Sequence, residues 1–265
     1  MRSKYLWLVP CITSCCLLVP PAVAIVYQVP GSYSTIQAGI NACTPGDTVL
    51  VDPGTYPEWI DLAGKAILVG SWYILTGDTA HVRQTVIQPP AGVLTSVVSF
   101  INGETRSTRL SGFTITGGNV DNGGGIRCVG ASPVLDHLRI VDNVALNDGG
   151  GIHAFEGLPL VTACWISGNT ATSGDGGGIW SQYSGIFIED NEIHGNHAWF
   201  RGAGIFCEYA TPTINDNIVT GNIIDRPPGM YRYGGGIVSR VCVSVIIGNY
   251  VAGNDGGGFG GGIFY

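Results

Sequence analysis

A glycine-rich tetrapeptide recurs through the second half of the chain at a nearly constant interval. The isoleucines that end it are separated by 26, 27, 26, 32 and 26 residues. A period of about 20–50 residues is the signature of a solenoid, in which each repeat forms one coil that buries its apolar side against its neighbours. The tetrapeptides are GGGI or GAGI and lie at Gly123–Ile126, Gly149–Ile152, Gly176–Ile179, Gly202–Ile205, Gly234–Ile237 and Gly260–Ile263.

An asparagine recurs at a similar interval, and aliphatic residues precede it at two fixed offsets. The asparagine column is assigned to Asn143, Asn169, Asn196, Asn222 and Asn249, with Gly118 in the same slot one coil earlier. Three residues before these positions stand Ile115, Ile140, Ile166, Ile193, Val219 and Ile246, and eight residues before them stand Leu110, Leu135, Val161, Ile188, Ile214 and Val241. With the tetrapeptide isoleucine, this gives three short apolar segments per unit without a helical period, which predicts three short strands per coil. The asparagine amides are expected to hydrogen-bond along their column.

The composition excludes several other protein classes. The chain has 42 glycines in 265 residues, but glycine does not recur at every third position, which excludes collagen. So much glycine excludes long helices, because each helical glycine costs about 1 kcal/mol. A hydrophobic fraction of 45% excludes disorder. The net charge of −7 repels phosphate backbones, so no nucleic-acid partner is expected.

Residues 1–24 have the pattern of a secretory signal peptide. Arg2 and Lys4 precede an apolar run over residues 6–19, and Ala22-Val23-Ala24 is a small-x-small cleavage site. We therefore expect export to the cell surface or the medium, with residues 25–265 forming a single domain. Prolines interrupt the run, which argues against a membrane span. Cys15 lies in a loose lipobox, so a lipoprotein anchor is a weaker alternative.

Five cysteines remain after such a cleavage. Their number is odd and they show no CxxC spacing, so small buried free thiols are favoured over disulfides or a metal site. They are Cys43, Cys128, Cys164, Cys207 and Cys242.

The two ends of the predicted solenoid differ. Ser34 is expected to cap a helix over Thr35–Cys43 whose Ile36 and Ile40 share one face, and this short helix would cover the first coil. A strand is expected over Thr48–Val51. The sequence stops at Tyr265, two residues after the last tetrapeptide. The expectation is that the solenoid is truncated or uncapped there, with a further C-terminal coil or an end-to-end contact covering the open end.

Two groups of motifs resemble known β-helix proteins. The segment STIQAGINACTPGDTVLVDPGTYPEWIDLAGKAILVG resembles the N-terminal part of secreted proteins of the pectin-lyase-like superfamily. The repeated GGGI, with IVDN, ISGN, IHGN, VTGN and IIGN, resembles the GGxI and FxxN repeats of polymorphic outer-membrane proteins. The resemblance implies an all-β, right-handed parallel β-helix (solenoid), with three short strands per coil of about 26 residues. It leaves the function open, because that superfamily includes lyases, hydrolases and adhesins.

Two neighbouring corners depart from the repeat and are the predicted binding site. One spans residues 197–201, and the next, spanning 223–233, is longer. Aromatic faces stack on sugars and guanidinium groups pair with carboxylates, so these loops suit an anionic polysaccharide or cell-surface glycan. The alternative is a loop whose aromatic residues only cover the coil edges. The candidate substrate-binding residues are Trp199, Arg201, Arg226, Tyr231, Arg232 and Tyr233.

Three further groups of residues are weaker candidates. The column after the tetrapeptide isoleucine could form a sugar-binding track, with Trp180 and Phe206 as its aromatic members, or could pack against loops. Asp148 and Asp175 would stack one coil apart and could hold Ca²⁺, although such aspartates often serve turns. Catalytic candidates are Arg226, Arg232 and His197, with carboxylates at Asp136, Glu189, Asp190 and Asp216 and a further histidine at His194.

No catalytic signature accompanies these candidates. The favoured interpretation is therefore an exported, non-catalytic solenoid that binds or adheres to carbohydrate, with no required cofactor. The alternative is a polysaccharide lyase or glycoside hydrolase that acts at the two irregular corners.

Overall fold

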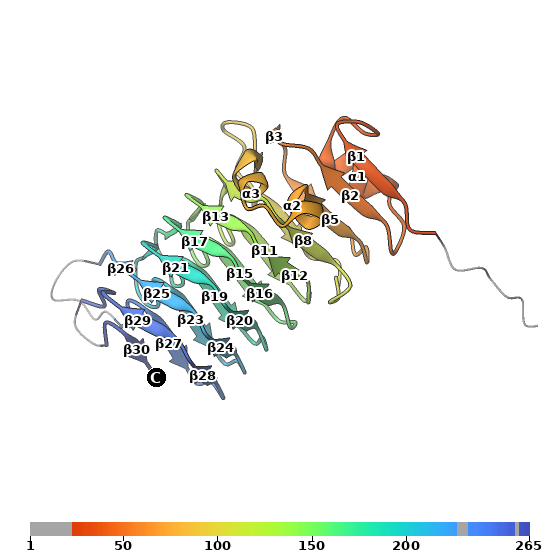
Figure 1. Cartoon of the computed structure of the whole chain (residues 1–265). Helices are drawn as coiled ribbons and strands as arrows, with labels where there is room; N and C mark the ends of the chain where they lie inside the picture. Colours follow the sequence, from red (N-terminus) through yellow and green to blue (C-terminus); the bar gives the residue numbers. More distant parts are fainter. Residues whose placement is uncertain (1–22, 227–232, 258–259) are drawn as a thin grey trace, which may run out of the picture.

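The computed structural model describes residues 23–226, 233–257 and 260–265, and most of the predicted signal peptide lies outside these ranges. The chain winds into a stack of coils, with the N-terminal strands and helices at one end and the last strands at the other (Figure 1). Every pairing between the named strands is parallel, and consecutive members of a sheet come from successive coils. The predicted parallel β-helix is confirmed.

Three long sheets form the sides of the coil. The first sheet contains β1 (Val26–Val29), β2 (Thr48–Val51), β5 (Leu68–Ser71), β8 (Arg109–Ser111), β12 (Val134–Asp136), β16 (Leu160–Thr162), β20 (Phe187–Glu189), β24 (Thr213–Asn215) and β28 (Val245–Ile247). The second contains β3 (Gly54–Pro57), β6 (Thr85–Gln88), β9 (Thr114–Thr116), β13 (Arg139–Val141), β17 (Trp165–Ser167), β21 (Glu192–His194), β25 (Ile218–Thr220) and β29 (Tyr250–Ala252). The third contains β4 (Ile60–Asp61), β7 (Val98–Phe100), β11 (Ile126–Val129), β15 (Ile152–Phe155), β19 (Ile179–Gln182), β23 (Ile205–Glu208), β27 (Ile237–Arg240) and β30 (Ile263–Phe264).

A fourth, narrow ladder lies between the second and third sheets. Its strands have two residues each, so each regular coil has three main strands and one short bridge. They are β10 (Asn119–Val120), β14 (Val144–Ala145), β18 (Thr170–Ala171), β22 (His197–Ala198) and β26 (Ile223–Ile224).

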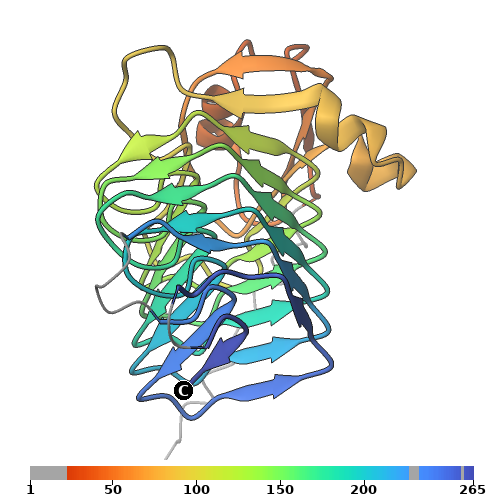
Figure 2. The same ribbon diagram turned by 90° about the vertical axis from the view of Figure 1, so that its left-hand side faces the viewer.

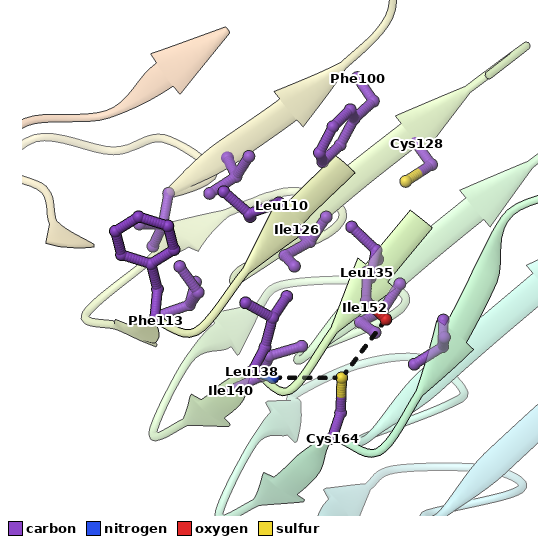
Figure 3. Packing of buried hydrophobic residues seen from close by; sticks show 14 of the residues in the cluster. Phe100, Leu110, Phe113, Ile126, Cys128, Leu135, Leu138, Ile140, Ile152 and Cys164 are labelled. Atoms are coloured by element: carbon purple, nitrogen blue, oxygen red, sulfur yellow. Dashed lines mark hydrogen bonds between the residues drawn. The ribbon is translucent and has the colours of Figure 1, made fainter. Parts of the chain in front are cut away.

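The inward residues of the three sheets form the core. Figure 3 shows Leu110, Leu135 and the isoleucines of two tetrapeptides, Ile126 and Ile152, packed in one apolar cluster with Phe100. Equivalent aliphatic residues are Cα partners on successive coils, such as Val161 with Ile188 and Ile179 with Ile205. This stacking is what stabilises a coil that could not bury its apolar side alone.

The asparagine ladder is present, but its last member was assigned wrongly. The side-chain amide of Asn222 donates to Oδ1 of Asn254 at 2.8 Å, whereas Asn249 belongs to a different column. The sequence interval of 27 residues between Asn222 and Asn249 is a coincidence, because the long corner between Asn222 and Gly234 shifts every later residue. The earlier steps join Asn143 to Asn169, Asn169 to Asn196 and Asn196 to Asn222 at 3.0 Å each.

The aliphatic columns of the last coil need the same correction. Ile246 pairs with Ile214 on the first sheet, and Val251 takes the place after Val219 on the second. Val241, which had been placed in the buried column, is 64% exposed with a positive φ of 54°.

A second asparagine ladder lies at the corner between the first and second sheets. The side-chain amide of Asn191 donates to Asn217, and that of Asn217 donates to Asn249, at 2.9 Å each. Cys164 occupies the preceding position, where its Sγ accepts from the backbone N–H of Leu138. This ladder is not evident in the sequence, because Cys164 replaces an asparagine in one coil and the step from Asn217 to Asn249 is 32 residues long.

Glycine is required in the tetrapeptides for two reasons. The first glycine has a positive φ, as at Gly176 with 64°. The third has no room for a side chain, because a Cβ on Gly178 would lie 2.6 Å from the carbonyl oxygen of Gly204 in the next coil. The glycine excess therefore marks one closely packed corner of the coil.

Three short helices lie near the N-terminal end. The predicted cap helix is α1 (Ile36–Ala42), with Ile36 and Ile40 buried as expected. Its N-cap is Thr35 rather than Ser34, because Oγ1 of Thr35 accepts from the N–H of Ala38 at 3.1 Å. Helices α2 (Tyr73–Thr76) and α3 (Ala80–Gln84) project sideways from the stack between β5 and β6 (Figure 2).

All five cysteines of the described chain are free thiols, and four of them are buried while Cys242 is half-buried. Burial raises the pKa of Cys164 to about 12 and that of Cys43 to about 11, so both are protonated at neutral pH. The prediction of small buried thiols is confirmed for Cys43, Cys128, Cys164 and Cys207. Among the described residues, no helix has the length and apolarity that crossing a membrane would require.

Candidate functional site

A groove of about 550 Å³ separates α3 from the outer face of the second sheet. Its walls are Thr79, Val82 and Arg83 at α3, Arg139, Trp165 and Glu192 on the sheet, and His137, Leu138 and Ala163 at the corner with the first sheet. Helix α3 is held against the sheet by the hydroxyl of Thr114, which donates to the carbonyl oxygen of Val82 at 2.8 Å.

Three functional side chains of the groove come from successive coils. Arg139, Trp165 and Glu192 are Cα partners on β13, β17 and β21. Because Ile140 and Ile166 next to them are buried, alternation along the strand directs these three outward. The sheet therefore places a cation, an aromatic ring and a carboxylate in one row, at the strand spacing of about 4.8 Å.

Trp165 supplies the aromatic surface of the groove and is 39% exposed. Its indole N–H donates to Oγ of Ser167 at 2.9 Å. The ring of His194 packs edge-on against it, with centroids 4.4 Å apart. These two contacts hold the indole in one orientation while much of it stays accessible.

The two arginines of the groove form no ion pair with an acidic residue of the described chain. In the part of the chain that the structure describes, the ion pairs within 4.0 Å involve neither Arg83 nor Arg139. Glu192 is also outside these pairs. Two guanidinium groups and one carboxylate therefore face the groove on a protein whose net charge is −7, which makes the groove locally basic.

An aspartate–histidine pair lies at the edge of the groove. Nδ1 of His137 is 2.6 Å from Oδ1 of Asp136, and the hydroxyl of Ser111 donates to Oδ2 of Asp136 at 2.7 Å. Arg109 is the third partner of this carboxylate, and the ring of Tyr73 stacks on His137 with centroids 4.6 Å apart. Asp136 is 3% exposed, so its carboxylate is buried among these partners.

The surroundings of Asp136 favour its ionised form. Burial alone would raise the pKa of Asp136, but hydrogen bonds from Arg109, Ser111 and His137 outweigh it and lower the pKa. An ionised carboxylate accepts a hydrogen bond from the Nδ1–H of His137, which leaves Nε2 as the ring nitrogen that can take up a proton.

The two irregular corners predicted from sequence do come together. Phe200, Arg201, Arg226 and Tyr233 line a smaller hollow of about 240 Å³. The guanidinium of Arg226 lies 4.6 Å above the ring of Phe200, which the sequence analysis had not chosen as a candidate. Tyr231 and Arg232 lie outside the described residues. Trp199 is half-buried and is not part of this wall.

Arg201 is engaged within the protein. Its Nη2 donates to Oδ2 of Asp175 at 2.7 Å and its Nε donates to Oδ1 at 3.1 Å. Its guanidinium also lies 4.7 Å above the ring of Phe206. A sugar carboxylate would have to compete with Asp175 for this fork, so the corner hollow is the weaker binding candidate.

The predicted sugar-binding track is not accessible. Trp180 is 6% and Phe206 1% exposed, and both pack with Val238 in a separate apolar cluster. The track prediction is wrong because the glycine corner turns back over these residues: a Cβ on Gly176 would lie 2.7 Å from Cβ of Trp180. Trp180 and Phe206 instead pack beneath a corner of the chain, which was the alternative interpretation of this column.

Asp148 and Asp175 are adjacent, as predicted, but protein groups occupy the space between them. The N–H of Asp175 donates to Oδ1 of Asp148 at 2.8 Å, and Arg201 neutralises Asp175. Burial raises the pKa of Asp175 to about 6, despite its bonds to Arg201. No group of three or more acidic, histidine or cysteine side chains among the described residues could hold a metal ion. The arrangement of Asp148 and Asp175 therefore does not fit the predicted calcium site.

The remaining catalytic candidates are dispersed. Nδ1 of His197 lies 3.0 Å from Asp225, in the bridge ladder rather than in the groove. Asp190 and Asp216 are left-handed corner residues with φ of 57° and 54°. Glu189 is two coils from Asp136 in the same outward column. Sequence reasoning missed the groove because α3, which forms one wall, lies outside the repeat.

Comparison with known proteins agrees with this architecture. The family model described as "Right handed beta helix region" matches residues 98–264. The structure is similar to a mutant pectin methylesterase in complex with a hexasaccharide, with 11% sequence identity and a TM-score of 0.48, covering 86% of this chain and 80% of that one. At that degree of similarity, the match carries no inference about function. No curated protein matches the sequence.

Proposed function

The chain belongs to the right-handed β-helix family, and from that premise we propose that it binds an anionic carbohydrate in the groove between α3 and the second sheet. The observation that carries the proposal is the exposed indole of Trp165 beside two guanidinium groups, those of Arg83 and Arg139, that lack acidic partners within the described chain. An aromatic face stacks on the apolar side of a sugar ring, and a guanidinium fork pairs with a carboxylate.

The groove suits this ligand better than the two irregular corners do. Its volume of about 550 Å³ falls within the range of about 300–1,000 Å³ that is usual for small-molecule sites. The row formed by Arg139, Trp165 and Glu192 runs along the solenoid axis, so a polysaccharide could follow it from coil to coil. We propose that the protein acts outside the cell, in keeping with the signal pattern of residues 1–24.

Binding can be tested with a hexamer of galacturonic acid as an anionic probe. We expect it to quench tryptophan fluorescence in the wild type, and titration calorimetry, which does not need the indole as a reporter, to show that Trp165→Ala and Arg139→Ala each weaken binding at least tenfold. Tyr250→Ala is the matched control, because Tyr250 lies in the same outward column, two coils beyond Glu192, and is 63% exposed. Binding that is unchanged in Trp165→Ala and Arg139→Ala would exclude the groove.

A second candidate function, a lyase, is favoured by the pair formed by Asp136 and His137. In a uronate polymer, Nε2 of His137 would take the proton on the carbon next to the carboxylate. The electron pair of that C–H bond would form a C=C bond, and the glycosidic oxygen on the adjacent carbon would leave and be protonated by water. Arg139 would stabilise the negative charge that develops on the carboxylate.

Product formation separates the two functions. A non-catalytic binder retains the hexamer without producing unsaturated ends, which absorb in the ultraviolet. A lyase produces them, and His137→Ala would abolish the product while leaving fluorescence-detected binding within about threefold of the wild type.

A further inference from the structure

The corner between the third and first sheets has an unusual residue choice. Each coil has one residue there with a left-handed backbone: Glu156 at φ 57°, Tyr183 at 51° and Tyr209 at 48°, with Gly130 one coil before them and Val241 one coil after. This conformation suits glycine and, to a lesser degree, asparagine and aspartate. Two consecutive tyrosines are therefore not what backbone stability alone would select, and such strain is a reason to look for function.

The two tyrosine rings form an exposed pair on successive coils. Their centroids are 5.7 Å apart and their planes are within 15° of parallel. Tyr183 is 55% and Tyr209 46% exposed. The ring of Phe155 packs edge-on against Tyr183, with centroids 5.8 Å apart, and limits its rotation. The pair thus presents an ordered aromatic surface to solvent.

A hollow of about 370 Å³ lies beside this pair. Its lining is formed by Tyr183 and Tyr209 together with Gly157, Leu158, Ser184, Gly185, Ala210 and Thr211. Gly185 has no side chain, and a Cβ there would lie 2.6 Å from Cδ2 of Leu158, so this position keeps the hollow open. Thr211 and the two tyrosines are the lining residues that carry hydroxyl groups, together with Ser184.

No charged residue is among those that line the hollow. Two acidic residues adjoin the lining. Glu208 is buried and bonded to Gln182 and Arg240, and Glu156, one coil before Tyr183, is exposed. An anion would gain no counter-charge from the lining residues, and Glu156 would disfavour it further. A neutral ligand with an apolar face and hydroxyl groups could stack on the tyrosine rings and hydrogen-bond to the hydroxyl groups of the lining.

We propose that this hollow is a second carbohydrate subsite, which takes a neutral sugar residue of a glycan on the faces of Tyr183 and Tyr209. It differs from the groove in ligand charge and in position, because the groove is basic and lies on the second sheet. The volume of about 370 Å³ is within the range of small-molecule sites. The proposal is independent of groove binding, and either can fail without the other.

Titration calorimetry of the whole protein tests the proposal, with cellohexaose, xylohexaose and mannohexaose as neutral probes. We expect at least one of them to bind, and Tyr183→Gly and Tyr209→Gly each to weaken that binding about tenfold. Glycine removes the ring and also relieves the left-handed backbone, so a loss of binding would not reflect unfolding. Glu156→Gly is the matched control, because it relieves the same conformation one coil earlier and removes no ring.

Three outcomes would overturn the proposal. One is that none of the neutral hexamers binds at millimolar concentration. Another is that binding is unchanged in both tyrosine variants, or is abolished by Trp165→Ala, which would place the ligand in the groove. The last is that the tyrosine variants alter the sedimentation of the protein and not its glycan binding, which would make the hollow a contact between copies of the chain.

Discussion

The guanidinium of Arg201 and the carboxylate of Asp175 form a two-bond ion pair that joins one coil to the next, with Nη2–Oδ2 at 2.7 Å and Nε–Oδ1 at 3.1 Å. The Asp175 side chain is only 9% exposed, so its charge has little access to water. Arg201 also lies 3.9 Å from Glu208 and above the ring of Phe206. Arg201 therefore faces two carboxylates, those of Asp175 and Glu208, and Glu208 has a second cationic partner in Arg240.

Arg201→Ala is expected to destabilise the protein by about 3 kcal/mol. Removing one partner of a buried ion pair costs about 3–5 kcal/mol, and the lower end applies because the Arg201 side chain is 28% exposed. Urea denaturation at neutral pH measures the change. Arg127→Ala removes an exposed arginine of the third sheet and should change the free energy of unfolding by less than about 0.5 kcal/mol. Equal values for the two variants would show that the pair contributes nothing.

His153 is expected to make the protein less stable in acid. Burial against Trp180, with the charge of Arg127 adding to it, lowers the pKa of His153 to about 4 from an ordinary value of 6.5. The neutral ring is favoured in the folded state. Its contribution is therefore complete above pH 6.5 and is lost as the pH falls from about 6.5 to about 4, to a total of about 3 kcal/mol.

His153→Phe isolates this contribution. Phenylalanine can stack on Trp180 in the same way and does not titrate, and Nδ1 of His153 has no hydrogen-bond partner among the residues that the structure describes. The variant should lose less stability than the wild type between pH 7 and pH 4, as measured by urea denaturation at a series of pH values. If the unfolding free energies of the two proteins fall in parallel as the pH is lowered, the loss of stability in acid does not come from His153.

The repeat predicts the fold well because the same physical constraint acts in every coil. The isoleucine of each tetrapeptide must be buried, and its third glycine must let the backbone of the next coil approach closely. The six tetrapeptides, from Ile126 to Ile263, could therefore be aligned from sequence alone. The alignment failed at Asn249 because the longer corner places the partner of Asn222 32 residues on rather than 27. The difference of five residues is also the separation of the two ladders, as between Asn217 and Asn222, so an asparagine of the other ladder stood at the expected position.

The candidate sites were harder to predict because they depend on neighbours outside the repeat. Trp165 and Arg139 look like ordinary outward strand residues, and only the position of α3 places them in a groove. Conversely, Trp180 and Phe206 occupy an outward column that the next corner covers. Alternation along a strand shows which residues point outward, but it does not show what packs over them.

Asn196→Ala is expected to lower the free energy of unfolding by at least about 3 kcal/mol. Oδ1 of Asn196 accepts from the backbone and side-chain N–H groups of Asn169, and its amide donates to Ile166 and Asn222. The substitution leaves several buried polar groups unpaired, at about 1–3 kcal/mol each. Asn254→Ala at the half-exposed end of the ladder is the comparison and should cost about 1 kcal/mol, because water can replace the amide. Urea denaturation measures both changes. Equal losses of unfolding free energy in the two variants would show that burial does not determine how much an asparagine of the ladder contributes.

Gly178→Ala is expected to destabilise the protein by at least about 3 kcal/mol, or to prevent soluble expression, although it adds only a methyl group. That group would lie 2.6 Å from the carbonyl oxygen of Gly204, a backbone atom of the next coil, so it cannot be accommodated by a side-chain rotation. The strands would have to move apart, and the ladder between β19 and β23 would weaken with them. Gly31→Ala is the control, because its Cβ would meet Gln28 at 3.5 Å, an ordinary contact. Urea midpoints for the two variants measure the difference, and a tolerated Gly178→Ala would mean that the coils are not packed at the distance described.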